Sequence, residues 1–116
     1  MNRVLRVVAI WKDATDPSDD RLTIDVVVND QNLVLKKCMT FGFMGSASPN
    51  AEKFHPFALR IDGTLANGSD TGEPDDTDES VNIHGKKAEM GELFTYLQDG
   101  EEYIYRIAQI VDLGEP

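Results

Sequence analysis

The chain has 116 residues, of which 41% are hydrophobic and 28% charged, and 21 acidic residues against 11 basic ones give a formal net charge of −10. This length and composition predict a single domain over residues 1–116 with one hydrophobic core. The excess negative charge repels nucleic-acid backbones and anionic membranes, so we expect neither as a direct partner.

The cysteine content and the N-terminal segment indicate a cytoplasmic protein. Cys38 is the only cysteine, so no intramolecular disulfide can form, as is typical of reducing compartments. The apolar run 4–11 is interrupted by Arg6 and lacks a small-residue cleavage site, so it predicts a strand rather than a signal peptide.

Two strands are predicted in the first quarter of the chain. Residues 4–12 are apolar on both faces, which indicates a central strand covered on two sides. Residues 13–20 hold four aspartates and a proline and predict a turn. Residues 21–29 alternate between apolar and mostly polar side chains, as in a half-buried antiparallel strand.

Residues 33–43 resume extended structure and are expected to form a hairpin with the strand 21–29. We expect one face of this run to hold Leu33, Leu35, Met39, Phe41 and Phe43. Residues 44–53 follow as a loop of small residues. Because Pro56 cannot donate a backbone hydrogen bond, residues 57–62 are predicted as a short edge strand.

The last third of the chain predicts one short strand, one helix and one long strand. Residues 81–84 form the short strand, and residues 101–113 form a long strand that is apolar on both faces. Residues 86–99 predict a helix that ends at Gly100, because four apolar residues follow the i, i+3, i+4, i+7 spacing: Met90, Leu93, Phe94 and Leu97.

These elements predict an α+β domain that is mainly β. We expect an antiparallel sheet, or a small half-open barrel, of five to six strands with one helix late in the chain. The helix is expected to pack across one face or end of the sheet. The first and last strands are the most apolar, so they are expected near its middle.

An acidic loop is predicted at about residues 62–80. Between Ile61 and His84 the chain holds seven carboxylates and no lysine or arginine. Packed core is excluded for such a stretch, because each buried unpaired carboxylate would cost several kcal/mol. The loop therefore lies in water, against a cation or against a basic partner.

A calcium site is a weak interpretation of this loop. With Asn67 as the first position of an EF-hand loop, Gly72 occupies the sixth position correctly. However, the first ligand is not Asp, Asp78 stands where the motif has Glu, and Pro74 takes an apolar position. A solvated loop and a polyanion that docks on a basic partner remain open.

Catalytic and metal sites are not indicated. Cys38 falls within a predicted strand, where a free cysteine usually behaves as a small buried hydrophobe, and no oxyanion-hole motif accompanies it. His55, His84 and Cys38 lack the close paired spacing of zinc sites. We expect no enzyme activity and no cofactor, and we assign the main aromatic residues to the core: Trp11, Phe41, Phe43, Phe94, Tyr103 and Tyr105.

The leading hypothesis is a small acidic binding protein that inhibits or antagonises a basic protein, of the immunity-protein or phage-encoded nucleic-acid-mimic type. Its predicted docking surface consists of Asp70, Glu73, Asp75, Asp76, Asp78 and Glu79. A second choice is Asp16, Asp19 and Asp20, although turn and cap roles also explain these residues.

Two alternatives belong to other classes of protein. The first is an assembly component of a virion or larger complex, in which sheet edges and aromatic side chains matter more than charge. The second is a small-ligand-binding domain with a pocket between sheet and helix, near Met90, Phe94 and Tyr105.

Overall fold

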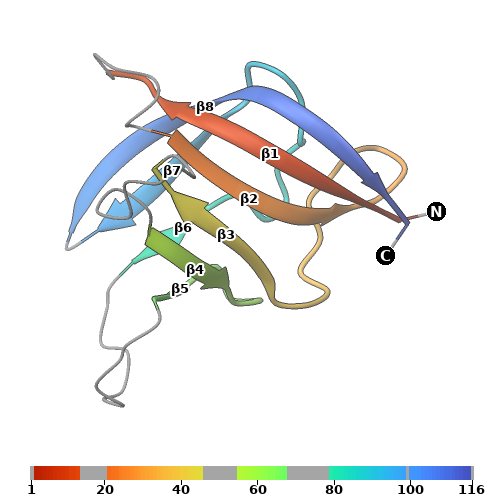
Figure 1. The fold of residues 1–116 in the computed structure, drawn as a ribbon, viewed down its shortest axis with the longest axis horizontal. Coiled ribbons are helices and arrows are strands. Elements are labelled where there is room, and N and C mark those ends of the chain that lie inside the picture. The colour runs from red at the N-terminus through yellow and green to blue at the C-terminus, as the bar shows by residue number, and fades with distance from the viewer. Residues whose placement is uncertain (1, 14–20, 46–54, 68–78, 99, 116) are drawn as a thin grey trace.

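A computed structural model describes residues 2–13, 21–45, 55–67, 79–98 and 100–115. In this part of the chain the secondary structure consists of eight strands and no helix (Figure 1). The strands are β1 (Arg3–Trp11), β2 (Arg21–Val28), β3 (Thr40–Met44), β4 (His55–Leu59), β5 (Leu65–Asn67), β6 (Ser80–Val81), β7 (Leu93–Gln98) and β8 (Glu101–Gly114).

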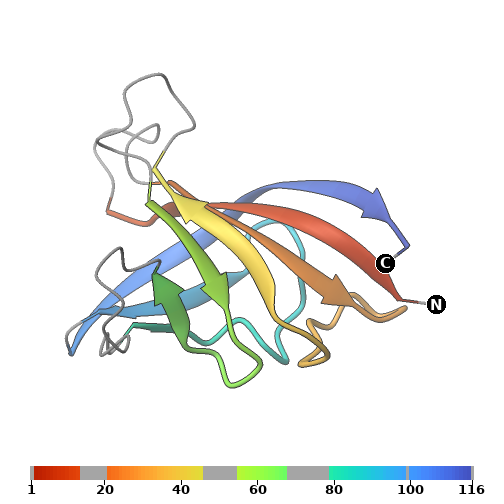
Figure 2. The ribbon, with the colours of Figure 1, turned by 60° about the horizontal axis from the view of Figure 1, so that its bottom comes forward.

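All eight strands belong to one antiparallel sheet in the order β5-β4-β3-β2-β1-β8-β7-β6. Figure 2 shows how the sheet curls until β5 comes beside β6. The two edges meet through a bridge between Thr64 and Ser80 and a 2.9 Å hydrogen bond from Leu65 N to Glu79 O. The fold is therefore a nearly closed up-and-down barrel, in which each strand lies beside its neighbours in sequence.

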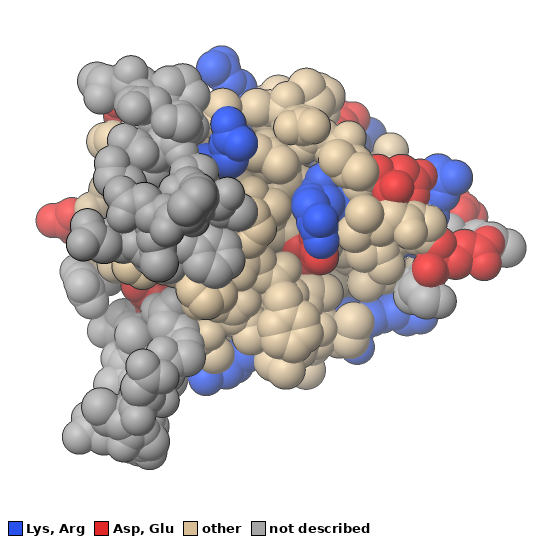
Figure 3. Space-filling view, in the orientation of Figure 1, with Lys and Arg blue, Asp and Glu red and all other residues tan. Residues whose placement is uncertain are grey.

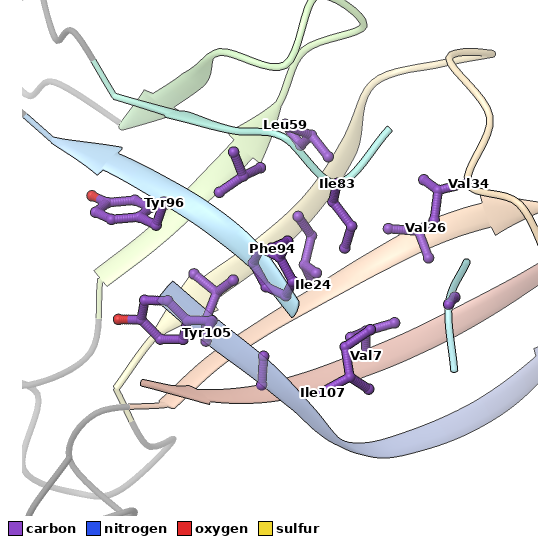
Figure 4. Close-up of a cluster of buried hydrophobic side chains, with 14 of the residues drawn as sticks. Val7, Ile24, Val26, Val34, Leu59, Ile83, Phe94, Tyr96, Tyr105 and Ile107 are labelled. Atoms are coloured by element: carbon purple, nitrogen blue, oxygen red, sulfur yellow. The ribbon is translucent and has the colours of Figure 1, made fainter. Parts of the chain in front are cut away.

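The expected position of the first and last strands is confirmed, because β1 and β8 are neighbours at the centre of the sheet order. Their inward positions hold Val7, Ala9, Tyr105 and Ile107, all buried. Figure 4 shows side chains from opposite walls meeting inside the barrel. The β-rich class predicted from the sequence is confirmed, although the barrel has eight strands rather than five or six.

The predicted helix 86–99 is wrong. Its second half is strand β7, and Gly91 in its first half has a φ of 88°, which does not fit a helix. Phe94 and Tyr96 alternate into the core, a period of two. Gly100 does not end a helix; with φ 83° it belongs to the two-residue connection that joins Gln98 to Glu101 in a hairpin.

The predicted strand 33–43 is shorter than expected. Only residues 40–44 form β3, and residues 33 and 34 make isolated bridges to Lys87 and Val28. Phe41, which we assigned to the core, is 62% exposed, and Met39 on the same predicted face is 51% exposed. The assignment of Phe41 to the core is therefore wrong.

Strand β4 is not the predicted edge strand, since it pairs with both β3 and β5. Pro56 pairs with Phe43 of β3, and the pairs with β5 begin only at Phe57. Among the described residues, the missing N–H of Pro56 therefore interrupts no pair with β5.

A bulge in β8 changes which of its residues face inward. Val8 pairs with Gln109 while Ala9 pairs with Ile107, so β8 holds one extra residue there. Beyond the bulge Ile110 packs against the core and Val111 is exposed, contrary to a strict alternation from Tyr103.

Gly42 is required in β3 by close approach of its neighbours. A Cβ at this position would lie 2.3 Å from Thr23 O and 2.9 Å from Phe57 Cζ. The Phe57 ring occupies the space that a side chain at 42 would need. The absence of a side chain therefore allows β3 to lie under Phe57.

Candidate functional site

The up-and-down topology sends alternate connections to opposite ends of the barrel. One end, which we call the acidic end, holds the strand residues that flank four connections: 12–20, 45–54, 68–79 and 99–100. At the other end, which we call the neutral end, the strands are joined by three connections: 29–39, 60–64 and 82–92. In Figure 1 the acidic end is on the left and the neutral end on the right.

The charge of the chain divides along the same line. The four connections of the acidic end hold 12 of the 21 acidic residues and two of the 11 basic ones, which gives them a formal charge of −10. The other nine acidic and nine basic residues cancel. The whole net charge of the protein therefore belongs to connections at one end.

The neutral end is closed by backbone hydrogen bonds between two connections. Val34 N donates to Lys86 O at 2.9 Å, Gly85 N to Val34 O at 2.8 Å and Ala88 N to Asn32 O at 2.8 Å. Val34, Ala88 and Ile83 are buried in the core. This end is thus an integral part of the folded barrel.

Charges of both signs lie close together outside the acidic connections. The connections of the neutral end hold five basic and four acidic residues. Figure 3 shows Lys and Arg side chains beside Asp and Glu side chains on the described part of this face. Among them, Asp62 accepts hydrogen bonds from Thr64 Oγ1 at 2.6 Å and Thr64 N at 3.0 Å, which lower the pKa of its carboxyl group.

A pocket of about 220 Å³ opens among the described residues of the acidic end, and we call it the mouth pocket. It is lined by Met44 of β3, His55 of β4, Glu79, and Tyr96 and Gln98 of β7. Glu79 is only 9% exposed and accepts a hydrogen bond from Gln98 Nε2 at 3.0 Å. The pocket therefore combines an apolar wall with one buried carboxylate.

Aromatic side chains form a packed layer beneath this pocket. The Tyr96 ring lies 6.2 Å from the rings of both Tyr103 and Tyr105, and Trp11 meets Tyr103 edge-on at 5.8 Å. Tyr105 in turn stacks on Phe94 at 6.0 Å. The layer links the pocket to the core, so the Tyr96 side chain is held in place.

Most of the predicted docking residues lie outside the described residues. This applies to Asp16, Asp19, Asp20, Asp70, Glu73, Asp75, Asp76 and Asp78, and to nearly all of the EF-hand ligands considered above. Glu79 is described, and the expectation that the entire acidic stretch avoids the core does not hold for it, because its side chain is buried. The hydrogen bond from Gln98 helps to compensate this burial.

Cys38 and the two histidines do not form one cluster, because the histidines lie at opposite ends of the barrel. Cys38 is exposed rather than buried and lies in a connection of the neutral end, whereas His55 lies at the acidic end. His84 is half-buried at the neutral end, and burial, followed by the positive charge of Lys36, lowers the pKa of its imidazole. In the described part of the chain, no three His, Cys, Asp or Glu residues are grouped to hold a metal ion.

The ligand pocket expected between sheet and helix does not exist at the predicted place. Phe94 and Tyr105 stack on each other within the core, and Met90 is 63% exposed at the neutral end. The mouth pocket was not predicted from the sequence. A signal was available in β7, where the inward positions Phe94, Tyr96 and Gln98 change from apolar to polar at the strand end.

No family model matches the sequence, and neither the characterised proteins nor the solved structures searched contain a match. Within the described ranges there is no helix of the length and hydrophobicity needed to cross a membrane.

Proposed function

We propose that this chain is a small acidic binding protein, without enzyme activity, that docks on a basic protein surface through the acidic end of its barrel. One observation supports the proposal above all. The connections at this end account for the entire formal charge of −10, while the rest of the chain is electrically neutral.

Such a charge distribution orients the molecule as well as attracting it. Charge spread evenly over a surface would draw a basic partner to any face, whereas charge at one end favours approach by that end. Electrostatic steering of this kind raises association rates by about 10- to 1,000-fold and weakens as salt is added.

Grooves that bind phosphate backbones are typically lined by basic side chains. The proposal therefore includes inhibitors or antagonists that occupy such a groove in place of nucleic acid, as immunity proteins and phage-encoded mimics do. We place this role in the cytoplasm, because a chain with one cysteine suits a reducing compartment. The proposed contacts are Asp70, Glu73, Asp75, Asp76, Asp78 and Glu79, with Asp16, Asp19 and Asp20 as a second choice.

Two variants with the same net charge test the proposal. The first removes three charges at the acidic end (Asp70→Asn, Asp75→Asn, Asp76→Asn), and the second removes three elsewhere (Glu89→Gln, Glu92→Gln, Glu115→Gln). A partner is captured from the source cell with the wild-type protein, purified, and measured against all three proteins over a series of salt concentrations.

The expected result is a fall in association rate of about tenfold at low salt for the acidic-end variant and little change for the control. The salt dependence should also become shallower for the first variant alone. Equal effects of the two variants would show that net charge alone is responsible, and would contradict docking by the acidic end.

An assembly role is favoured by a different observation on the outer wall of the barrel. Met39 and Phe41 are exposed, and Phe41 lines a surface hollow of about 150 Å³ together with Arg6, Asp25 and Phe43. Aromatic side chains exposed in this way are typical of protein interfaces. Light scattering coupled to size exclusion tests this role, since self-association that Phe41→Ser abolishes would support it.

A further inference from the structure

We infer that the mouth pocket receives one lysine or arginine side chain of the basic partner and so anchors the complex. This inference deepens the proposed function and rests on it. The carboxylate of Glu79 is the group that recognises the cation, and Met44 and Tyr96 contact the aliphatic part of the side chain.

The size of the mouth pocket fits a single side chain. Its volume is about 220 Å³, whereas pockets for drug-sized ligands and cofactors occupy roughly 300–1,000 Å³. The thioether of Met44 adapts to neighbours of varied shape, and the Tyr96 ring offers a flat apolar surface. A lysine or arginine has an apolar stem and a charged head, and these match the two parts of the pocket.

The position of Glu79 makes its charge more effective than those of the exposed carboxylates. Because only 9% of this residue is exposed, water and salt screen its attraction to a cation less than they screen charges in solvent. The hydrogen bond from Gln98 Nε2 fixes the carboxylate at the pocket wall. A carboxylate accepts up to about four hydrogen bonds, so this bond is compatible with an incoming guanidinium or ammonium group.

The aromatic layer gives the pocket a rigid base. Tyr96 is held against Tyr103 and Tyr105, with ring centroids 6.2 Å apart in both pairs. Figure 4 shows the hydroxyl groups of Tyr96 and Tyr105 pointing in the same direction, away from Ile107. A pocket that is already formed loses little conformational entropy when it binds, which lengthens the lifetime of a complex.

These properties assign the acidic connections and the mouth pocket to different steps of binding. The acidic residues of the connections act over a distance and set the association rate, whereas the buried carboxylate of Glu79 acts only on contact and sets the dissociation rate.

An NMR titration with small probes tests the inference without requiring the partner. The probes are acetyl-arginine methylamide, acetyl-lysine methylamide and, as a neutral analogue of arginine, acetyl-citrulline methylamide. We expect saturable shifts of the signals of Glu79, Tyr96 and Gln98 with the first two probes and at least tenfold weaker binding of the citrulline probe.

Matched variants locate the binding in the pocket. Glu79→Gln should weaken arginine binding at least tenfold, whereas Glu102→Gln, which removes an exposed carboxylate from the outer wall, should change it less than twofold. His55→Lys places a competing ammonium at the rim and should weaken binding like Glu79→Gln, while the exposure of His55 makes this variant safe for folding.

Several outcomes would overturn the inference. These are equal binding of the citrulline probe, shifts that do not saturate, or unchanged affinity in both Glu79→Gln and His55→Lys. The proposed function is judged separately by the triple variants. Equal effects of the two triple variants on docking, with intact probe binding, would reject the proposed function alone. The expected loss of docking in the acidic-end variant, without probe binding by the wild type, would reject only the anchor.

Discussion

The two ends of this barrel differ in the charge of their connections and in the way the described residues close them. At the neutral end, connections 29–39 and 82–92 hydrogen-bond to each other and bury Val34, Ile83 and Ala88 in the core. At the acidic end, the described residues surround an open pocket, and the connections hold the whole net charge. Under the proposed function, stability and recognition are separated along one axis, because strand pairing in an up-and-down barrel does not depend on what the connections at one end contain.

The largest effect on the free energy of unfolding is expected from truncating a buried side chain at the neutral end. Ile83 is 1% exposed, so Ile83→Ala should lower the free energy of unfolding by about 2–5 kcal/mol through lost burial and a cavity. Urea denaturation, followed by the fluorescence of the single tryptophan, Trp11, measures it. Met44→Ala at the acidic end is the control, and an equal loss there would contradict the comparison.

A smaller effect is expected in the wall that joins the two ends. Gly42→Ala would place a methyl group against Thr23 O and the Phe57 ring, and should destabilise the fold by about 1–3 kcal/mol. The double variant Gly42→Ala with Phe57→Leu should recover part of this loss in the same urea experiment. No recovery would mean that the contact with the Thr23 backbone alone decides the effect.

Removing charge at the acidic end should leave stability intact or raise it slightly. The triple variant Asp70→Asn, Asp75→Asn, Asp76→Asn relieves repulsion between like charges, so the free energy of unfolding should rise by about 0.5 kcal/mol at low salt. High salt should abolish the difference, because it screens the repulsion. A loss of more than about 1 kcal/mol would show that these side chains make stabilising contacts.

The smallest effect is expected from His84 at the neutral end. Burial and Lys36 lower its pKa below 6.5, against the opposing influence of Asp62, so the folded state resists protonation. The resulting contribution to stability is complete above pH 6.5 and is lost as the pH falls towards the folded-state pKa. Urea midpoints between pH 7.5 and 5.5 should decline less in His84→Gln than in the wild type, and an NMR titration should place the His84 pKa below 6.5.

The sequence predicted those strands whose alternation is long and unbroken. The bounds expected for β1, β2 and β8 agree with the structure to within a residue or two, because burial of an apolar face with a period of two leaves a clear pattern. The helix prediction for residues 86–99 was wrong because Met90, Leu93, Phe94 and Leu97 fit the helical spacing. The strand β8, whose pairing makes β7 a strand, begins only at Glu101, beyond the segment that shows this spacing.

The candidate site was predictable only in part. The acidic stretches are evident in the sequence, but the mouth pocket unites Met44, His55, Glu79 and Tyr96 from four separate segments. Apart from the change from apolar to polar side chains along β7, these residues have no local signal that distinguishes them from ordinary strand ends. Their proximity depends on the pairing of β3 with β4 and of β6 with β7.

By itself, the sequence determined that the protein is rich in strands and that its first and last strands contribute to the core. It also determined that the carboxylates are concentrated in segments that cannot all be packed in the core. Both follow from the sequence because hydrophobic alternation and charge are local properties. Only the tertiary structure decided that these segments join strands at one end, that the remaining charges cancel, and that Glu79 is withdrawn from water. Those features depend on strand order and register, which are fixed by contacts between residues far apart in the chain.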